Sequence, residues 1–68
     1  MYKQERTCVC LHDTVYPVDV GEELEFHKGR EYQVDVYPLY YAVYQNGGWN
    51  DVIYITEEQF NNNFRLIE

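Results

Sequence analysis

The segment Phe26–Val34 does most to limit what this 68-residue chain can fold into. Phe26 supplies an apolar anchor, and Gly29 supplies a turn because glycine adopts positive φ at no steric cost. The side chains then alternate: Tyr32, Val34 and Val36 share one face, and Glu31, Gln33, Asp35 and Tyr37 share the other. This period of two predicts a strand over Glu31–Tyr37 with one buried face and one face in water.

Three further segments have the composition of strands. They are Thr7–His12, Tyr40–Gln45 and Val52–Ile55, rich in β-branched and aromatic residues. The loop Asn46–Asn50 joins the second of these to the third, and its two glycines suit the positive φ of a hairpin turn. Arg65–Ile67 is a candidate for a short closing strand.

A short helix is predicted between the last two strands. Thr56 and Gln59 form a capping box, in which the Thr56 hydroxyl accepts from the Gln59 amide and the Gln59 side chain reaches back. Phe60 and Phe64 are four residues apart and therefore share a helix face. The run Asn61–Asn63 has low helix propensity, so we expect about two turns.

These elements predict one mainly β domain over residues 1–68, a small barrel with Phe60 and Phe64 at one end. Residues 1–6 are polar and are expected to fray. Residues 13–25 are expected to form a long connection, tethered by Val18, Val20 and Leu24. The predicted core is Cys8, Cys10, Phe26, Tyr32, Val34, Val36, Val43, Ile53, Ile55, Phe60, Phe64 and Leu66.

The order of motifs resembles one group of very short proteins encoded by bacteriophages and by prophage regions of bacteria. The motifs are Phe26-x-x-Gly29-x-x-Tyr32-x-Val34, Tyr41-x-Val43, Ile53-x-Ile55-Thr56 and Glu57-Glu58-x-Phe60-x-x-x-Phe64. The resemblance covers residues 26–67 and implies a five-stranded SH3-like barrel with one short helix near the C-terminus. This chain has Arg30 where the group has lysine, and it adds an acidic segment before Phe26. Most of the group has no known activity, so the resemblance implies no catalytic residues.

Charge and size limit the function. Twelve carboxylates against five Lys and Arg give a net charge of −7, which disfavours direct contact with nucleic-acid phosphates and with anionic membranes. A domain this small has little room for an enzyme pocket, so we expect a protein that is not an enzyme and holds no cofactor. The expected partner is a protein with a basic or neutral surface. No signal peptide or transmembrane segment is visible, which predicts a cytoplasmic protein, and the resemblance to phage-encoded proteins implies a bacterial host cell.

Cys8 and Cys10 lie two residues apart on the first predicted strand and therefore point to the same face. A disulfide between them would require the strand to buckle. With His12 they offer three ligands for a metal or a Cys–His nucleophile, whereas a structural zinc site takes four. We expect two reduced thiols facing the core, an exposed His12, no catalytic residue and no metal.

Two groups of residues are candidates for partner binding. One is acidic: Asp19, Glu22, Glu23 and Glu25, which could form a row of carboxylates with Glu31 and Asp35 of the following strand. The other is aromatic: Tyr37, Tyr40, Tyr44 and Trp49, with Tyr41 beside them. The acidic group either imitates the charge of DNA or is a solvated loop. The aromatic group either forms an interface or consists of cross-strand pairs that hold the sheet together.

The leading hypothesis is a non-enzymatic phage or prophage accessory protein that binds and modulates a host or phage protein, as an acidic inhibitor or DNA mimic. One alternative is a structural or assembly module that forms homo-oligomers through exposed edge strands. Another is a protein with a Cys/His metal site. The first hypothesis predicts a monomer in isolation, and the second predicts a small homo-oligomer.

Overall fold

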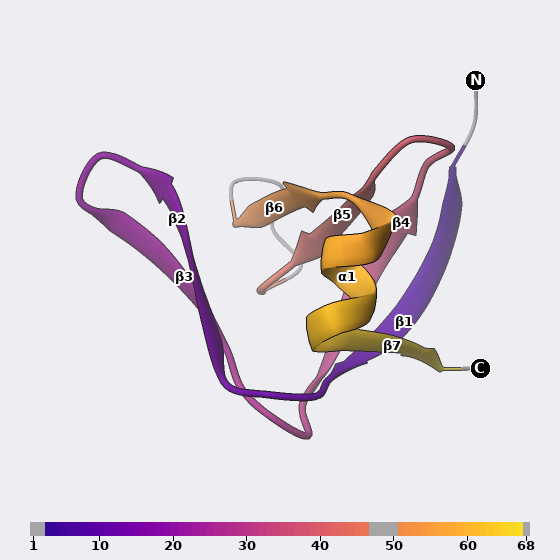
Figure 1. Cartoon of the computed structure of the whole chain (residues 1–68), viewed down its shortest axis with the longest axis horizontal. Coiled ribbons are helices and arrows are strands. Elements are labelled where there is room, and N and C mark those ends of the chain that lie inside the picture. Colours follow the sequence, from indigo (N-terminus) through magenta and orange to yellow (C-terminus); the bar gives the residue numbers. More distant parts are fainter. Residues whose placement is uncertain (1–2, 47–50, 68) are drawn as a thin grey trace.

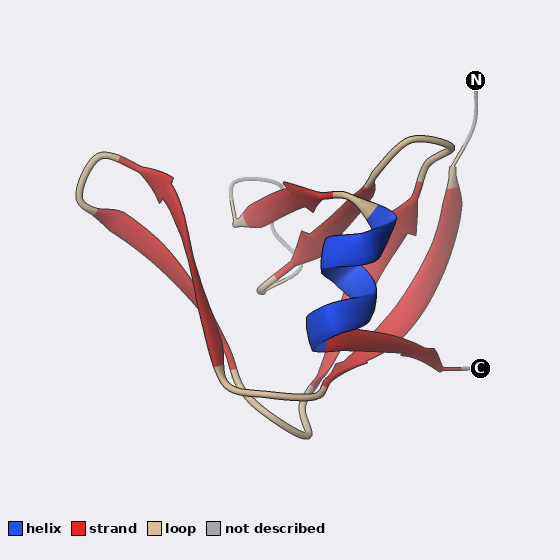
Figure 2. Cartoon of the chain, viewed as in Figure 1, coloured by secondary structure: helices blue, strands red, loops and turns tan. Residues whose placement is uncertain are grey.

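The computed structural model describes residues 3–46 and 51–67. Its elements are β1 (Gln4–Cys10), β2 (Thr14–Asp19), β3 (Glu22–Phe26), β4 (Glu31–Val36), β5 (Tyr41–Tyr44), β6 (Val52–Ile55), α1 (Glu57–Asn63) and β7 (Phe64–Ile67). The predicted class is confirmed, since the chain is mainly β with one short helix near the C-terminus (Figures 1 and 2). Within the described residues, no helix is long and apolar enough to cross a membrane.

Five strands form one antiparallel sheet in the order β6-β5-β4-β1-β7. The strands expected at Glu31–Tyr37, Tyr40–Gln45 and Val52–Ile55 are confirmed as β4, β5 and β6. The predicted glycine turn between β5 and β6 falls on residues 47–50, outside the described part of the chain. The expected fraying is wrong for residues 4–6, because Gln4 is paired with Val36 at the start of the β1–β4 ladder.

The long connection predicted over residues 13–25 is wrong, because this segment forms most of a β-hairpin. β2 and β3 pair antiparallel: Thr14 lies opposite Phe26 at one end of the ladder, and Asp19 lies opposite Glu22 at the other. Gly21 makes the turn between the strands with a φ of 75°. The hairpin diverges from the five-stranded sheet towards its tip (Figure 1), while Tyr16, Leu24 and Phe26 pack its inner side against the core. We call the hairpin the arm. Of its expected tethers Leu24 is buried, whereas Val18 and Val20 are exposed.

The described residues therefore form seven strands in two sheets rather than five strands in a closed barrel. The five-stranded sheet is curved but does not close on itself. The reason lies in the arm: because β2 and β3 pair with each other, the two-stranded sheet is separate from the larger one. The structure thus does not show a closed SH3-like barrel, although the chain is mainly β.

The core lies between the inner face of the five-stranded sheet, α1 and the base of the arm. Phe26 is fully buried, with ring centroids 4.9 Å from Tyr32 and 5.4 Å from Phe64. The Phe64 and Phe60 rings stack at 5.4 Å. The predicted core is confirmed except that Val36 and Leu66 are only partly buried. Three residues were missed: Leu24, Ala42 and Asp35.

The helix α1 begins as predicted. The Gln59 amide donates to the Thr56 hydroxyl at 3.1 Å, and the Thr56 amide donates to the Gln59 side chain at 2.9 Å. Glu57 and Glu58 lie in the first turn, where the helix dipole favours negative charge. The cap fixes the direction in which α1 leaves β6, and so places Phe60 against the sheet.

We expect Thr56→Ala to lower the free energy of unfolding by about 1 kcal/mol, because it removes one half of the capping box. Thr56→Ser, which keeps the hydroxyl, is the matched control and should cost a smaller amount. Urea unfolding followed by circular dichroism measures both. An alanine variant as stable as the serine variant would show that the hydroxyl contributes nothing.

Candidate functional site

The acidic candidates lie on the arm. In β3 the buried Leu24 and Phe26 alternate with the exposed Glu23 and Glu25, and Glu22 is exposed at the start of the strand. Asp19 ends β2 and is paired with Glu22. The strand alternation gives Glu23 and Glu25 one outward direction, so these carboxylates belong to an ordered sheet face rather than to a loose loop.

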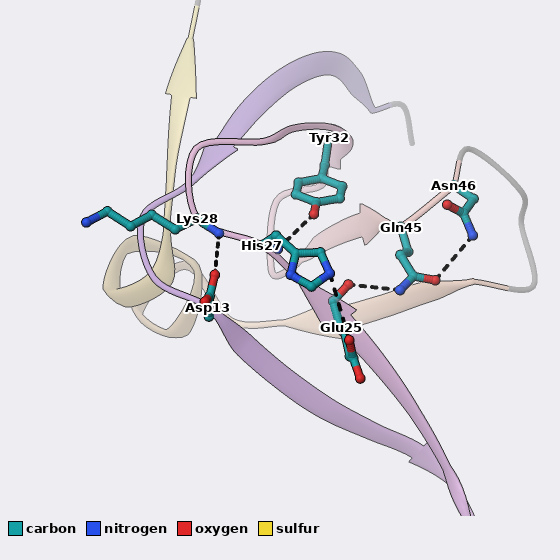
Figure 3. Close-up of polar contacts among 7 residues, drawn as sticks. All are labelled: Asp13, Glu25, His27, Lys28, Tyr32, Gln45 and Asn46. Carbon is teal, nitrogen blue, oxygen red and sulfur yellow. Dashed lines mark hydrogen bonds and ion pairs between the residues drawn. The ribbon is translucent and has the colours of Figure 1, made fainter.

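Hydrogen bonds hold the base of the arm to the body of the protein (Figure 3). The Gln45 side-chain amide donates to the carbonyl of Glu25 at 2.8 Å, and the amide of His27 donates to the Tyr32 hydroxyl at 2.9 Å. His27 Nε2 lies 3.8 Å from Glu25 Oε1. A shallow cavity of about 210 Å³ lies along this junction and is lined mainly by polar and charged side chains. The acidic face of β3 is thus fixed in position relative to the end of β5.

A second set of contacts closes the turn that follows the arm. The amide of Lys28 donates to Asp13 Oδ1 at 2.7 Å (Figure 3), and the amide of Gly29 donates to the carbonyl of Cys10 at 2.8 Å. Gly29 has a φ of 85°, as the sequence predicted. These bonds tie the turn before β4 to the end of β1.

The aromatic candidates divide between the two faces of the sheet. Tyr37 stacks on Tyr40 with ring centroids 4.6 Å apart, and Tyr40 meets the edge of Tyr54 at 5.8 Å. We call Tyr37, Tyr40 and Tyr54 the tyrosine cluster. Tyr41 instead packs on the inner side, stacked on Phe60 at 4.5 Å. Trp49 lies outside the described residues, so the expected patch of five aromatic residues is only partly assembled.

The tyrosine cluster is open to solvent. Tyr54 is 65% exposed and Tyr40 is 38% exposed, and the neighbouring Leu39 is 87% exposed. Tyr54 was missed as a candidate, although its place opposite the small Ala42 in the β5–β6 register leaves room for its ring to reach Tyr40. Knowledge of that register, rather than of composition, would have found it.

Asp35 was expected on the wet face of β4, and the structure buries it. It lies on the outer face, but only 1% of it is exposed. The Tyr44 hydroxyl donates to Asp35 Oδ2 at 2.9 Å, and Lys3 Nζ donates to the same oxygen at 3.1 Å. Among the described residues, Oδ1 has no hydrogen-bond partner. Tyr44 is therefore held by a carboxylate rather than displayed for contact.

The hydrogen bond to Asp35 raises the pKa of Tyr44 to about 12. Because this folded-state pKa lies above the ordinary value of 10.0, the stability that it contributes is present below about pH 10. That stability is lost as the pH rises from 10 towards 12. We expect the tyrosinate absorbance of the native protein to show one tyrosine titrating last, and Tyr44→Phe to remove that step. A last step that survives in Tyr44→Phe would assign it to another residue.

Cys8 and Cys10 face the core as predicted, and both are buried free thiols. Burial raises the pKa of Cys8 to about 12, which leaves almost no thiolate near neutral pH. Cys10 Sγ donates to the carbonyl of His12 at 2.8 Å, and the His12 side chain is exposed. Within residues 3–46 and 51–67, no group of three or more His, Cys, Asp or Glu side chains is placed to hold a metal ion.

Comparisons with protein-family models, with curated proteins and with solved structures find no match to this chain. The resemblance of residues 26–67 to short phage-encoded proteins therefore stays a prediction. The function of this chain is therefore inferred from the geometry of the arm and of the outer sheet face.

Proposed function

We propose that this chain is a small protein-binding module without catalytic activity, and that its partner presents a basic or neutral surface. The observation that carries the proposal is the exposed tyrosine cluster on the outer sheet face. Tyr40 and Tyr54 keep a large part of their area in solvent although their rings are already held against each other. Rings that are ordered before binding bury area at low entropic cost, which is why tyrosine is enriched in interface cores.

The charge distribution supports a basic partner. Within the described residues, the contacts at ion-pair distance are Lys3 with Asp35 and His27 with Glu25, and the second is ionic only when His27 is protonated. Most of the described carboxylates thus lie outside ion-pair distance of a cation, and the net charge of the chain is −7. Such a field accelerates association with a positively charged surface and repels nucleic acid. Glu22, Glu23 and Glu25 add exposed negative charge along β3 of the arm.

In its cellular setting, the proposal is a phage or prophage accessory protein that modulates a host or phage protein in the bacterial cytoplasm. The acidic arm would then act as an inhibitor that imitates the charge of DNA. We also propose that the fold is of the SH3-like barrel type. The sheet order β6-β5-β4-β1-β7, with α1 just before the last strand, supports this assignment.

The test is capture of partners from bacterial lysate on the immobilised full chain, followed by binding measurements with the purified partner. We expect the double variant Tyr40→Ser, Tyr54→Ser to weaken binding about tenfold or more, because it removes two exposed rings. The double variant Glu57→Gln, Glu58→Gln, which changes exposed charge on α1, is the control and should bind nearly as wild type. A partner held equally by the tyrosine variant would overturn the proposal.

The role of the arm is tested separately. Changing Asp19 to Asn and Glu22, Glu23 and Glu25 to Gln should slow association with the same partner and flatten its dependence on salt. If binding and its salt dependence stay unchanged, DNA mimicry by the arm is wrong, whereas binding through the tyrosine cluster is unaffected.

One observation favours the alternative of an assembly module. In the described sheet, β6 is an edge strand of sequence Val-Ile-Tyr-Ile, and a groove of about 310 Å³ separates it from residues 16–18 of β2. Apolar edge strands pair readily with further strands. Light scattering distinguishes the two functions: a stable oligomer that Tyr54→Lys dissociates supports assembly, and a monomer supports the binding module.

A further inference from the structure

Asp35 is the one charged side chain that the described structure buries, and its two carboxylate oxygens differ in their hydrogen bonding. Oδ2 accepts two hydrogen bonds, from Lys3 Nζ and from the Tyr44 hydroxyl, whereas Oδ1 accepts none. A carboxylate oxygen that is removed from water without a partner costs free energy, so native proteins rarely leave one. An ammonium group that donates to one oxygen does not satisfy the other. This site therefore lacks a donor.

The same place also lacks positive charge. Glu5 lies directly opposite Asp35 in the antiparallel β1–β4 register, and both residues belong to the outer face. Like charges at directly opposed positions destabilise a sheet. Lys3 is the cation within ion-pair distance of Asp35, and the described structure holds none within that distance of Glu5. Of the two opposed carboxylates, Asp35 thus has an ammonium group within ion-pair distance and Glu5 has none.

Lys3 is easily displaced from this position. It precedes the first residue of β1, so its withdrawal breaks no bond of the sheet ladder. Its side chain is 39% exposed and is held by the contact to Asp35. The Asp35 hydrogen bond raises the pKa of Lys3, and the Tyr44 hydroxyl donates to the same Asp35 oxygen as the ammonium group. An incoming cation of better geometry therefore competes with a single, partly solvated ion pair.

We propose that Asp35 and Glu5 form a seat for an arginine side chain of the partner protein, which Lys3 occupies in the free protein. A guanidinium group donates through two parallel N–H groups and so satisfies both oxygens of a carboxylate, which an ammonium group does not. An open groove of about 440 Å³, lined by residues 5–7 of β1 and 31–33 of β4, continues from this seat along the same two strands. Tyr37 of the tyrosine cluster follows Asp35 by two residues, just after the end of β4, and stacks on Tyr40.

This seat deepens the proposed function and rests on it, since it names the side chain by which a basic partner is recognised. It predicts a preference for arginine over lysine, which a general negative field does not produce. The experiment measures binding of acetylated and amidated tetra-arginine and tetra-lysine to the full chain by calorimetry at low ionic strength. The two peptides carry the same charge, so their ratio of affinities isolates the guanidinium geometry.

We expect the wild-type protein to bind tetra-arginine several-fold more tightly than tetra-lysine. Lys3→Met removes the occupant but keeps an apolar stem of similar length, and it should tighten tetra-arginine binding about tenfold. Asp35→Asn should abolish the preference. Glu58→Gln removes the same unit of charge from an exposed position on α1 and should leave the preference intact. If Asp35→Asn does not fold, Lys3→Met and the exposed Glu5→Gln, which should reduce the preference, carry the test.

Equal affinities for the two peptides in both wild type and Lys3→Met would overturn the arginine seat and leave binding of a basic partner in place. A preference that Asp35→Asn retains would do the same, because the selectivity would then come from another site. Failure to bind either peptide, together with a captured partner that is insensitive to the tyrosine variant, would count against the proposed function itself.

Discussion

Phe26→Ala is expected to unfold a large fraction of the protein under native conditions. Phe26 is fully buried, and its ring contacts Tyr16 at 5.9 Å, Tyr32 at 4.9 Å and Phe64 at 5.4 Å. Truncation of a buried phenylalanine costs about 3–5 kcal/mol. Domains of this size lie near the lower end of the ordinary stability range of roughly 5–15 kcal/mol, so this loss takes most of the total. Urea unfolding followed by circular dichroism gives the change directly.

Two variants control this measurement. Phe26→Leu keeps most of the apolar volume and should cost much less than the alanine change. Leu39→Ala removes an apolar side chain that is 87% exposed and should change stability by less than about 0.5 kcal/mol. Phe26 also joins the base of the arm to the core, so amide exchange in β2 and β3 should rise more than exchange in α1. An alanine variant as stable as Leu39→Ala would contradict the central place of this ring.

Cys8 should be almost unreactive towards thiol reagents in the native protein. Its pKa rises from 9.0 to about 12, mainly by burial, and its side chain is fully inaccessible. A raised pKa lowers the thiolate fraction at any given pH, here by roughly 1,000-fold near neutrality, and thiolate is the reactive form. Mass-resolved alkylation with and without urea measures the effect. We expect protection of Cys8 in the native state and full reaction of both thiols in urea.

The single variants Cys8→Ala and Cys10→Ala show which alkylation rate belongs to which thiol. Neither substitution should remove a disulfide or a metal site. Native Cys8 that alkylates within about tenfold of its rate in urea would show that the strand opens readily or that the thiol is not buried. The raised pKa of Cys8 also makes the stability of the protein depend on pH. The stability associated with a protonated Cys8 is present below about pH 9 and is lost as the pH rises towards 12.

Short-range signals predicted much of the fold. The positive φ of Gly29, the capping box from Thr56 to Gln59 and the bounds of β6 each depend on residues close together in the chain. Strand alternation places Cys8 and Cys10 on the same face, and the structure shows that this face is the buried one. Their physical basis is local sterics and local hydrogen bonding, which a sequence states directly.

The arm shows how a local signal can be read wrongly. The density of carboxylates in residues 19–25 favoured a solvated connection, yet Leu24 and Phe26 alternate with Glu23 and Glu25 as in any half-buried strand. The carboxylates predict a solvated loop, whereas the alternation of apolar and charged residues predicts a strand, and the structure follows the alternation. The same residues that made the segment look like a loop are the outward face of β3.

The candidate sites depended on long-range pairing. Tyr54 meets Tyr40 only because β5 and β6 pair in one register, and the burial of Asp35 requires Lys3, which lies 32 residues away in the sequence, and Tyr44. No local pattern distinguishes Asp35 from the exposed Gln33 on the same face. An isolated carboxylate in an alternating strand is therefore predicted to be wet, and only the tertiary partners reverse this.

The sequence alone determined that this is a small acidic β protein with a glycine turn after Phe26, with Cys8 and Cys10 on one face of a strand, and with a capped helix before its last strand, because each of these follows from neighbouring residues. Only the tertiary structure decided that the acidic segment is an arm, that the sheet stays open, and that Asp35 is buried beneath Lys3 and Tyr44 with one oxygen unpartnered. The physical reason is that strand pairing and burial bring together residues that are distant in the chain. Charge and alternation are local properties of the chain and do not show which distant residues strand pairing will place together.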